Sequence, residues 1–318
     1  MGYSSKKINL KNIFYSASPG LVSILLTFLS LPIYLKYLTP EYYSSFLISH
    51  IFMSLSLIFN FNIGKVASIK IQNKNIKLKS EIISNAIYLS LVIAIIFSSI
   101  IIFFLSFIFY KENQINFFLI FIGLVISILF INIESIAKGL GKFKIVALTN
   151  LLFYGFSISG PSFLIFSNFY LFNSEKVDLF SVSIILKIIS LLLIFLPITV
   201  YLIKNYKINK KIIFSFKNQS LWMTLSNMYN QIFDYLDKYL IKLFLNPIIF
   251  INYTVAQQIA SKLSIFSNAI TSVMLPKLAS QKSNLNRNKV LNLHLFLFYI
   301  PFSIFITLFD IYFDDLLK

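Results

Sequence analysis

The chain has few of the residues on which enzymes and metal sites usually depend. Its 318 residues include no cysteine, one tryptophan and two histidines. Without cysteine there is no disulfide, thiol nucleophile or cysteine metal ligand. The histidines, His50 and His294, lie too far apart in the sequence to suggest a metal motif, and no Gly-rich loop ending in Lys-Ser/Thr is present to bind nucleotide phosphates. We therefore expect no catalytic residue, no metal, no cofactor and no nucleotide-driven step.

Charged residues are also scarce: they make up 12% of the chain, whereas hydrophobic residues make up 58%. With a mean hydropathy of +0.81, this composition indicates an integral membrane protein rather than a soluble domain. Apolar runs long enough to cross about 30 Å of hydrocarbon predict about nine spans, of which the seventh and eighth are the most polar. The predicted spans are residues 13–35, 43–64, 83–109, 116–137, 145–168, 179–203, 220–245, 248–276 and 293–313.

The segments between the predicted spans alternate in charge. Twenty basic residues lie in the N-terminal segment and in every second connection, whereas the opposite connections hold four. Lysine and arginine are in excess in cytoplasmic loops. We therefore predict a cytoplasmic N-terminus, with residues 65–82 and 204–219 on the same side of the membrane. The asymmetry also explains the net charge of +17 without a nucleic-acid partner.

Two predicted spans in the second half carry polar side chains along one helical face. The stripe in the span 220–245 consists of Ser220, Thr224, Asn227, Gln231, Asp234 and Lys238. The stripe in the span 248–276 consists of Thr254, Gln258, Ser261, Asn268 and Ser272, with Lys262 beside it. Ionisable groups at membrane depth normally face a bundle interior or a wet cavity. The stripes predict a water-lined cavity; hydrogen bonding between helices is the alternative.

The two parts of the chain show an internal repeat with an offset of 207 residues. Residues 38–40 (Leu-Thr-Pro) resemble residues 245–247 (Leu-Asn-Pro), and each triplet lies in a predicted short turn between two spans. Span 1 also carries a stripe of small or polar residues: Ser16, Gly20, Ser23, Thr27, Ser30 and Tyr34. Six spans precede the second copy, so the copies run parallel. Because the second copy has three predicted spans, we expect a truncated or partial sequence.

Several segments, taken in order, resemble one transporter family. They are residues 31–35, 37–43, 64–65, 138–143, 237–241, 255–262 and 275–278. They resemble, in the same order, segments of Wzx-type polysaccharide and O-antigen flippases. The matching segments of that family are the first span and its turn, the end of the second span, the turn after the fourth span, an Asp-Lys stretch in the seventh, and the eighth span with the residues that follow it. These flippases are polysaccharide biosynthesis proteins of the multidrug/oligosaccharidyl-lipid/polysaccharide exporter superfamily. The matches extend along nearly the whole chain.

The resemblance implies an all-α, polytopic membrane protein with two lobes around a cationic cavity. Its implied task is to flip a polyprenyl-pyrophosphate-linked oligosaccharide across the bacterial inner membrane, for surface polysaccharides such as the O-antigen of lipopolysaccharide. The implied partners are the lipid-linked oligosaccharide, membrane lipid and other polysaccharide-assembly proteins. The predicted domains are a six-helix lobe at 1–205, a cytoplasmic linker at 206–219 and a partial, three-helix lobe at 220–318. About three helices of the family's twelve are absent, so we expect this chain to be inactive.

A flippase must compensate the charge of a pyrophosphate, because a compact anion cannot cross hydrocarbon unpaired. The candidate cations are Lys187, Lys238 and Lys262, with Lys65 at the cytoplasmic mouth. The candidate sugar ligands are the amides Asn227, Asn230, Gln257, Gln258 and Asn268. Asp234 and Asp237 are candidates for a coupling ion or proton, although Asp234 can instead pair with Lys238 four residues on. For Glu134 we expect an ion pair with Lys138.

Two other functions remain open at this stage. A multidrug-type, ion-coupled exporter of organic cations shares the superfamily resemblance, but it would favour an acidic, aromatic cavity. A membrane polysaccharide polymerase would be expected to have a long external loop with arginines, and the single arginine here, Arg287, is predicted to be cytoplasmic. An acyltransferase would need a membrane-embedded histidine, for which His50 is the only candidate in a predicted span before residue 293.

Overall fold

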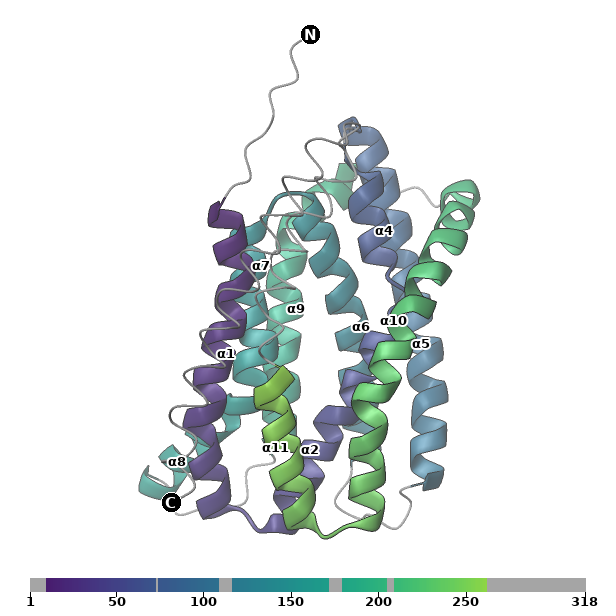
Figure 1. Cartoon of the computed structure of the whole chain (residues 1–318). Helices are drawn as coiled ribbons and strands as arrows, with labels where there is room; N and C mark the ends of the chain where they lie inside the picture. Colours follow the sequence, from purple (N-terminus) through teal and green to yellow (C-terminus); the bar gives the residue numbers. More distant parts are fainter. Residues whose placement is uncertain (1–9, 73, 109–115, 172–178, 205–208, 262–318) are drawn as a thin grey trace, which may run out of the picture.

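The computed structural model describes residues 10–72, 74–108, 116–171, 179–204 and 209–261 (Figure 1). Within these ranges every regular element is a helix, which confirms the all-α prediction. The elements are α1 (Leu10–Tyr37), α2 (Pro40–Ser54), α3 (Ser56–Phe59), α4 (Ile63–Lys70), α5 (Ile76–Ile108), α6 (Phe117–Gly139), α7 (Phe143–Asn150), the π-helical segment η1 (Leu151–Phe156), α8 (Ser157–Leu171), α9 (Leu179–Lys204), α10 (Lys210–Phe244) and α11 (Pro247–Ser261).

Six helical stretches of the described residues are long and apolar enough to cross a membrane. They are Phe14–Tyr37, Pro40–Phe59, Ile76–Ile108, Phe117–Gly139, Phe143–Phe166 and Leu179–Thr199. They coincide with the first six predicted spans, so the protein is a multi-pass membrane protein. Of the remaining predictions, α10 contains the seventh span but is too polar to meet the same criterion, and α11 covers the first part of the eighth. The ninth, at 293–313, lies outside the described residues.

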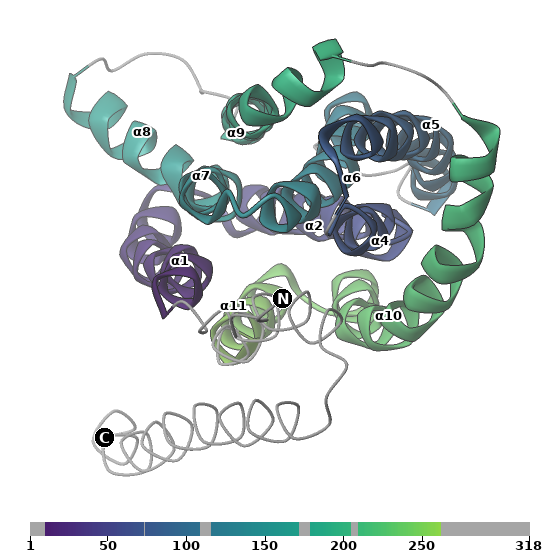
Figure 2. The same cartoon turned by 90° about the horizontal axis from the view of Figure 1, so that it is seen from above.

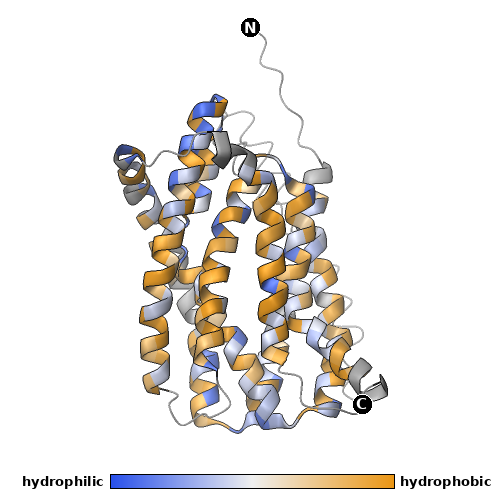
Figure 3. Cartoon of the chain, turned by 180° about the vertical axis from the view of Figure 1, so that it is seen from behind, coloured by the Kyte–Doolittle hydropathy of each residue, from blue (hydrophilic) through white to orange (hydrophobic). Residues whose placement is uncertain are grey.

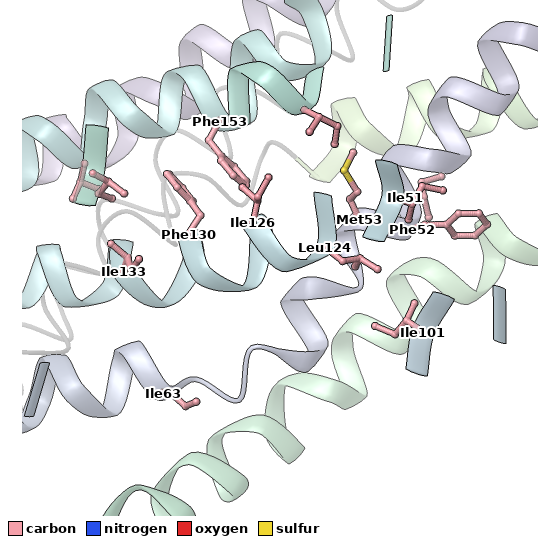
Figure 4. Packing of buried hydrophobic residues seen from close by; sticks show 14 of the residues in the cluster. Ile51, Phe52, Met53, Ile63, Ile101, Leu124, Ile126, Phe130, Ile133 and Phe153 are labelled. Carbon is pink, nitrogen blue, oxygen red and sulfur yellow. The ribbon is translucent and has the colours of Figure 1, made fainter. Parts of the chain in front are cut away.

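Helices α1 to α9 form one bundle, which we call the first bundle, with α6 packed against α4, α5 and α9 (Figure 2). Large side chains fill its interior: the rings of Phe130 and Phe153 stack with centroids 3.9 Å apart (Figure 4). Apolar residues dominate the middle of the helices, and polar residues gather towards their ends (Figure 3). In α5, only 22% of the most apolar stretch is buried. Within the described residues, most of this stretch therefore lies on the outside of the first bundle.

The small and polar stripe of α1 packs against span 5, which comprises α7, η1 and α8. Ser23 and Ser30 are buried, and Tyr34 donates a hydrogen bond to the carbonyl oxygen of Ile158. A Cβ built on Gly155 of η1 would lie 3.9 Å from the Cβ of Ser23. Small residues allow this close approach of two helices in a membrane. The stripe of α1, which corresponds to the polar stripe of α10 in the internal repeat, is therefore used for helix packing inside the first bundle.

Span 2 is broken into α2, α3 and α4, whereas its hydropathy predicts a continuous helix. The break lies at Phe61 and Asn62, whose φ angles are 53° and 49°. Asn132 of α6 closes it, because its Oδ1 accepts a hydrogen bond from the Gly64 N–H at 2.7 Å and its Nδ2 donates to the Asn60 carbonyl at 3.0 Å. Unpaired backbone groups are costly at membrane depth. Asn132 therefore makes the break stable inside the bundle.

The α1–α2 and α10–α11 turns are built alike, as the repeat predicts. In each, a polar residue precedes the proline that begins the next helix: Thr39 before Pro40, and Asn246 before Pro247. The side-chain oxygens of Thr39 and Asn246 accept hydrogen bonds from backbone N–H groups of the following helix, at 3.4 Å and 2.9 Å. Proline suits the first helical position because its missing N–H has no partner to lose there. The sequence match thus reflects one turn structure used twice.

Helix α10 begins at Lys210 and continues for 35 residues. Most of the segment 206–219, which the sequence analysis treats as a linker, therefore belongs to the same helix as the predicted span. The helix packs along span 2, against α2, α3 and α4, and also contacts α5 (Figure 2). The division into two lobes remains a prediction, because residues 262–318 lie outside the described part.

The segments 65–82 and 204–219 lie against each other. Lys70 Nζ donates hydrogen bonds to the carbonyl oxygen and the Oγ of Ser215, both at 2.7 Å. Nearby, the N–H of Asn209 donates to Asn85 Oδ1 at 2.8 Å. These contacts confirm that the two segments share one side of the membrane.

The cytoplasmic location of that side remains a prediction, and cysteine labelling tests it. Because the native chain has no cysteine, a membrane-impermeant maleimide reports only on introduced thiols. We expect Lys77→Cys and Lys211→Cys, at exposed positions, to be protected in intact cells and labelled in lysed cells. A cysteine replacing exposed Asn246, on the opposite side, is the control and should be labelled in intact cells. The reverse pattern would invert the topology.

Candidate functional site

The described side chains of the α10 stripe are buried, and those on the opposite face of the helix are exposed. Ser220, Thr224 and Lys238 are 5%, 3% and 8% exposed. The exposed face carries Leu225, Leu236, Leu240 and Leu243. The predicted inward orientation of the stripe is therefore confirmed at these positions. Three stripe side chains, those of Asn227, Gln231 and Asp234, lie outside the described part of the structure, and so does that of the candidate sugar ligand Asn230.

Asp237 joins α10 to α11 through its carboxylate. Its Oδ2 accepts hydrogen bonds from the Tyr253 hydroxyl and, at 3.3 Å, from Gln257 Nε2. Its Oδ1 accepts from the backbone N–H of Lys238 at 2.7 Å. The structure thus brings together two predicted site residues, Asp237 and Gln257. Tyr253 is not among the predicted site residues, although it precedes Gln257 by four residues and so shares its face of α11.

We call the contact between α10 and span 2 the seam, and the structure describes both of its ends. At one end, Lys70 binds the backbone and side chain of α10, and partial burial lowers the pKa of this lysine. At the other end, the rings of Tyr239 and Phe52 stack with centroids 5.5 Å apart, and Lys242 Nζ lies 3.4 Å from Ser44 Oγ. The polar stripe of α10 lies between these two ends.

Helix α11 contributes a second buried polar group. It packs against α2, and Thr254, one turn before Gln257 and Gln258, is fully buried. Within the described residues, the Thr254 hydroxyl has no hydrogen-bond partner. The predicted ligands Lys262 and Asn268 lie outside the described residues, and so does the side chain of Gln258.

Lys187 lies inside the first bundle rather than beside α10. Its side chain is 6% exposed, and its Nζ is 3.4 Å from Met53 Sδ and 5.0 Å from the centroid of the Phe153 ring. Helix α9, which carries it, packs against α5, α6, α8 and η1, and α2 lies between α9 and α11 (Figure 2). Lys187 therefore packs inside the first bundle, and its role as a substrate cation stays a prediction.

Glu134 forms the predicted ion pair with Lys138, with Oε1 and Nζ 2.7 Å apart. The same oxygen accepts a hydrogen bond from Asn150 Nδ2 at 2.7 Å. Lys65 belongs to this group: partial burial, followed by repulsion from Lys138, lowers its pKa, whereas Glu134 raises it. Two lysines therefore share one carboxylate at this end of the bundle, which leaves a local excess of positive charge.

A comparison with family models places the chain in a family. A family model described as "Polysaccharide biosynthesis protein" matches residues 9–281. The curated proteins contain no match. Among solved structures, the chain is similar to an outward-facing multidrug resistance MATE family transporter of the MOP superfamily, with 13% identity and a TM-score of 0.48, over 85% of this chain and 68% of that one. Because the family model covers well over half of the sequence, the chain belongs to the polysaccharide biosynthesis protein family.

Proposed function

We propose that this protein moves a polyprenyl-pyrophosphate-linked oligosaccharide from the cytoplasmic to the outer leaflet of the bacterial inner membrane. The observation that carries the proposal is the buried polar stripe of α10, with Lys238 inside it, in a membrane protein of the polysaccharide biosynthesis family. A transporter of this kind has no need of a catalytic residue, so we propose a carrier rather than an enzyme. Its N-terminus would lie in the cytoplasm.

The proposed substrate has two parts that need different chemistry. Its pyrophosphate is a compact anion and requires a cation away from water. Lys238, on the buried face of α10, is the candidate inside the membrane, and the excess positive charge around Lys65 is the candidate at the entrance. Its sugars require hydrogen-bonding groups, for which the amides of Gln257, Asn227 and Asn230 are suited. Asp237, held by Tyr253 and Gln257, is the proposed coupling-ion or proton site.

One observation favours a different cargo. Asp237 and Tyr253 place a carboxylate beside an aromatic ring, and this combination suits an organic cation. A multidrug-type exporter is therefore the second candidate. The family match favours an exporter over an acyltransferase, and His50, the candidate acyltransferase histidine, packs between the rings of Phe46 and Phe180.

The two candidates are separated by variants introduced at the natural chromosomal locus, so that each protein is produced at whatever length the gene encodes. Deleting the gene should leave lipid-linked oligosaccharide in the cytoplasmic leaflet and lower the surface polysaccharide. Lys238→Met should lower export about tenfold, which corresponds to about 1.4 kcal/mol of lost substrate stabilisation. Lys36→Met is the matched control, because Lys36 is exposed and should leave export unchanged. Surface polysaccharide and accumulation of a cationic dye are measured in each strain.

Surface polysaccharide and dye accumulation are expected to change differently for the two cargoes. A deletion strain with normal surface polysaccharide and raised dye accumulation would replace the oligosaccharide by an organic cation. A deletion strain in which neither quantity changes would refute both. Equal export by Lys238→Met and Lys36→Met would remove Lys238 from the site while leaving the proposed cargo intact.

A further inference from the structure

The first bundle contains a buried cation that has no counter-ion among the described residues. The contacts of Lys187 Nζ are a thioether sulfur, on Met53, and the face of an aromatic ring, on Phe153. Methionine sulfur is a weak hydrogen-bond acceptor, so at least two of the three N–H donors of a charged lysine lack a strong partner. The ion pair that the described residues do form, between Glu134 and Lys138, lies at the end of α6 and does not involve Lys187. An unpaired ammonium at this depth is costly.

Two more polar groups without a hydrogen-bond partner lie in the same interior. Among the described residues, neither His50 Nε2 nor Ser127 Oγ forms a hydrogen bond, although the side chains are only 7% and 2% exposed. Lys187 and His50 are close enough for their charges to interact. His50 also precedes Met53, the contact of Lys187, by three residues and therefore shares its face of α2.

The register of α6 and α9 brings Ser127 towards the same place. The two helices run in the same direction, since one span separates them, and they pack against each other. A Cβ on Gly123 of α6 would meet Met53 Sδ at 2.3 Å and Ile184 of α9 at 2.8 Å. Ser127 lies one turn beyond Gly123, and Lys187 lies one turn beyond Ile184. Most serines of this bundle donate to the carbonyl one turn back, as Ser183 does, whereas the Ser127 hydroxyl remains available.

We propose that Lys187, His50 and Ser127 form a binding site for a small monovalent anion inside the first bundle. The three groups supply N–H and O–H donors, and the described residues around them supply no carboxylate to compete. The surrounding side chains, Met53, Phe153 and Ile184, are apolar. Such a lining favours a weakly hydrated ion such as chloride or bromide over phosphate or sulfate, which would lose more hydration energy on entering. The site is separate from the seam, and it does not depend on the proposed cargo.

The experiment measures thermal unfolding of the purified full chain by circular dichroism at constant ionic strength. Chloride or bromide replaces gluconate stepwise. We expect the unfolding midpoint to rise saturably, by about 2–4 °C when the anion is at several times its Kd, and sulfate to give no such rise. Lys187→Met should abolish the chloride effect. It should also be at least as stable as the native chain in gluconate, because it removes an unpaired buried cation.

The control is Lys242→Met, which removes a partly buried lysine bound to Ser44 at the seam and should keep the full chloride effect. His50→Phe, which preserves ring packing, should weaken chloride binding severalfold. The proposal is overturned if the unfolding midpoint of the native chain does not change when chloride replaces gluconate. That result would mean that Lys187 is neutral and binds no anion. It is also overturned if Lys187→Met keeps the chloride effect or if Lys242→Met loses it.

Discussion

Replacing Gly64 by alanine is expected to destabilise the first bundle by about 3 kcal/mol or more. The added Cβ would lie 2.1 Å from the backbone oxygen of Asn132 and 2.6 Å from its Cα. Because these are backbone atoms of a packed helix, no side-chain rotation relieves the contact. Moving α6 away would also break the hydrogen bond between the Gly64 N–H and Asn132 Oδ1, which closes the break in span 2. The measurement is the unfolding midpoint of the purified protein, with the yield of monodisperse protein beside it.

Gly155→Ala is the matched control for this prediction. Gly155 is also buried in a helical segment, but its Cβ would meet the nearest atom, Leu26 Cδ1, at 3.4 Å. Alanine there costs no backbone strain and lowers the entropy of the unfolded chain, so we expect a gain of up to about 1 kcal/mol. Opposite signs at two buried glycines would show that the effect at Gly64 is local. A Gly64→Ala protein that unfolds at the native temperature would contradict the packing of α4 on α6.

The broken helix shows where prediction from the sequence stops. Residues 43–64 are mostly apolar and include no Asp, Glu, Lys or Arg, so hydropathy predicts one span. The break depends on Asn132, which lies 68 residues after Gly64, with a carboxamide that supplies both a donor and an acceptor. Such a non-local partner has no signal in a single sequence. The two asparagines at 60 and 62 are the only local indication, since asparagine tolerates positive φ better than most residues.

The stripes were predictable because they depend on local geometry alone. Helical spacing puts Ser220, Thr224 and Lys238 on one face, and a membrane makes burial of that face favourable. Which helix covers a stripe is a different question. The stripe of α1 packs on span 5, whereas that of α10 packs on span 2, although their spacing is the same. For the same reason the sequence places Lys187 in a span but does not say which helices surround it.

The proposed transport requires the contacts of the seam to open. Polar contacts join α10 to span 2 at both ends, through Lys70 at one and Lys242 at the other, and the polar stripe lies between them. A substrate cannot reach the stripe from either side of the membrane while both ends are closed. We therefore expect the two ends to open in turn, so that the stripe is exposed first to one leaflet and then to the other.

Cross-linking either end of the seam is therefore expected to lower export by about tenfold or more. The chain has no native cysteine, so introduced pairs are the only thiols. Lys70→Cys with Ser215→Cys tests one end, where Lys70 Nζ lies 2.7 Å from Ser215 Oγ, and a short bifunctional thiol reagent replaces the reach of the lost lysine. Ser44→Cys with Lys242→Cys tests the other, bridged by a short bifunctional thiol reagent that spans the reach of the lost lysine. Export is followed as surface polysaccharide before and after oxidation or cross-linking, and after reduction.

The control cross-link lies within the first bundle. Ser23→Cys with Gly155→Cys joins α1 to η1, where the two Cβ positions are 3.9 Å apart, within the range of about 3.5–4.5 Å that disulfides require. This bond does not cross the seam, so export should continue when it forms. Loss of export with the seam pairs, recovery on reduction and no loss with the control pair would identify α10 as the moving helix. Undiminished export with both seam cross-links complete would instead show that the substrate passes elsewhere, because α10 and span 2 would then be a fixed contact.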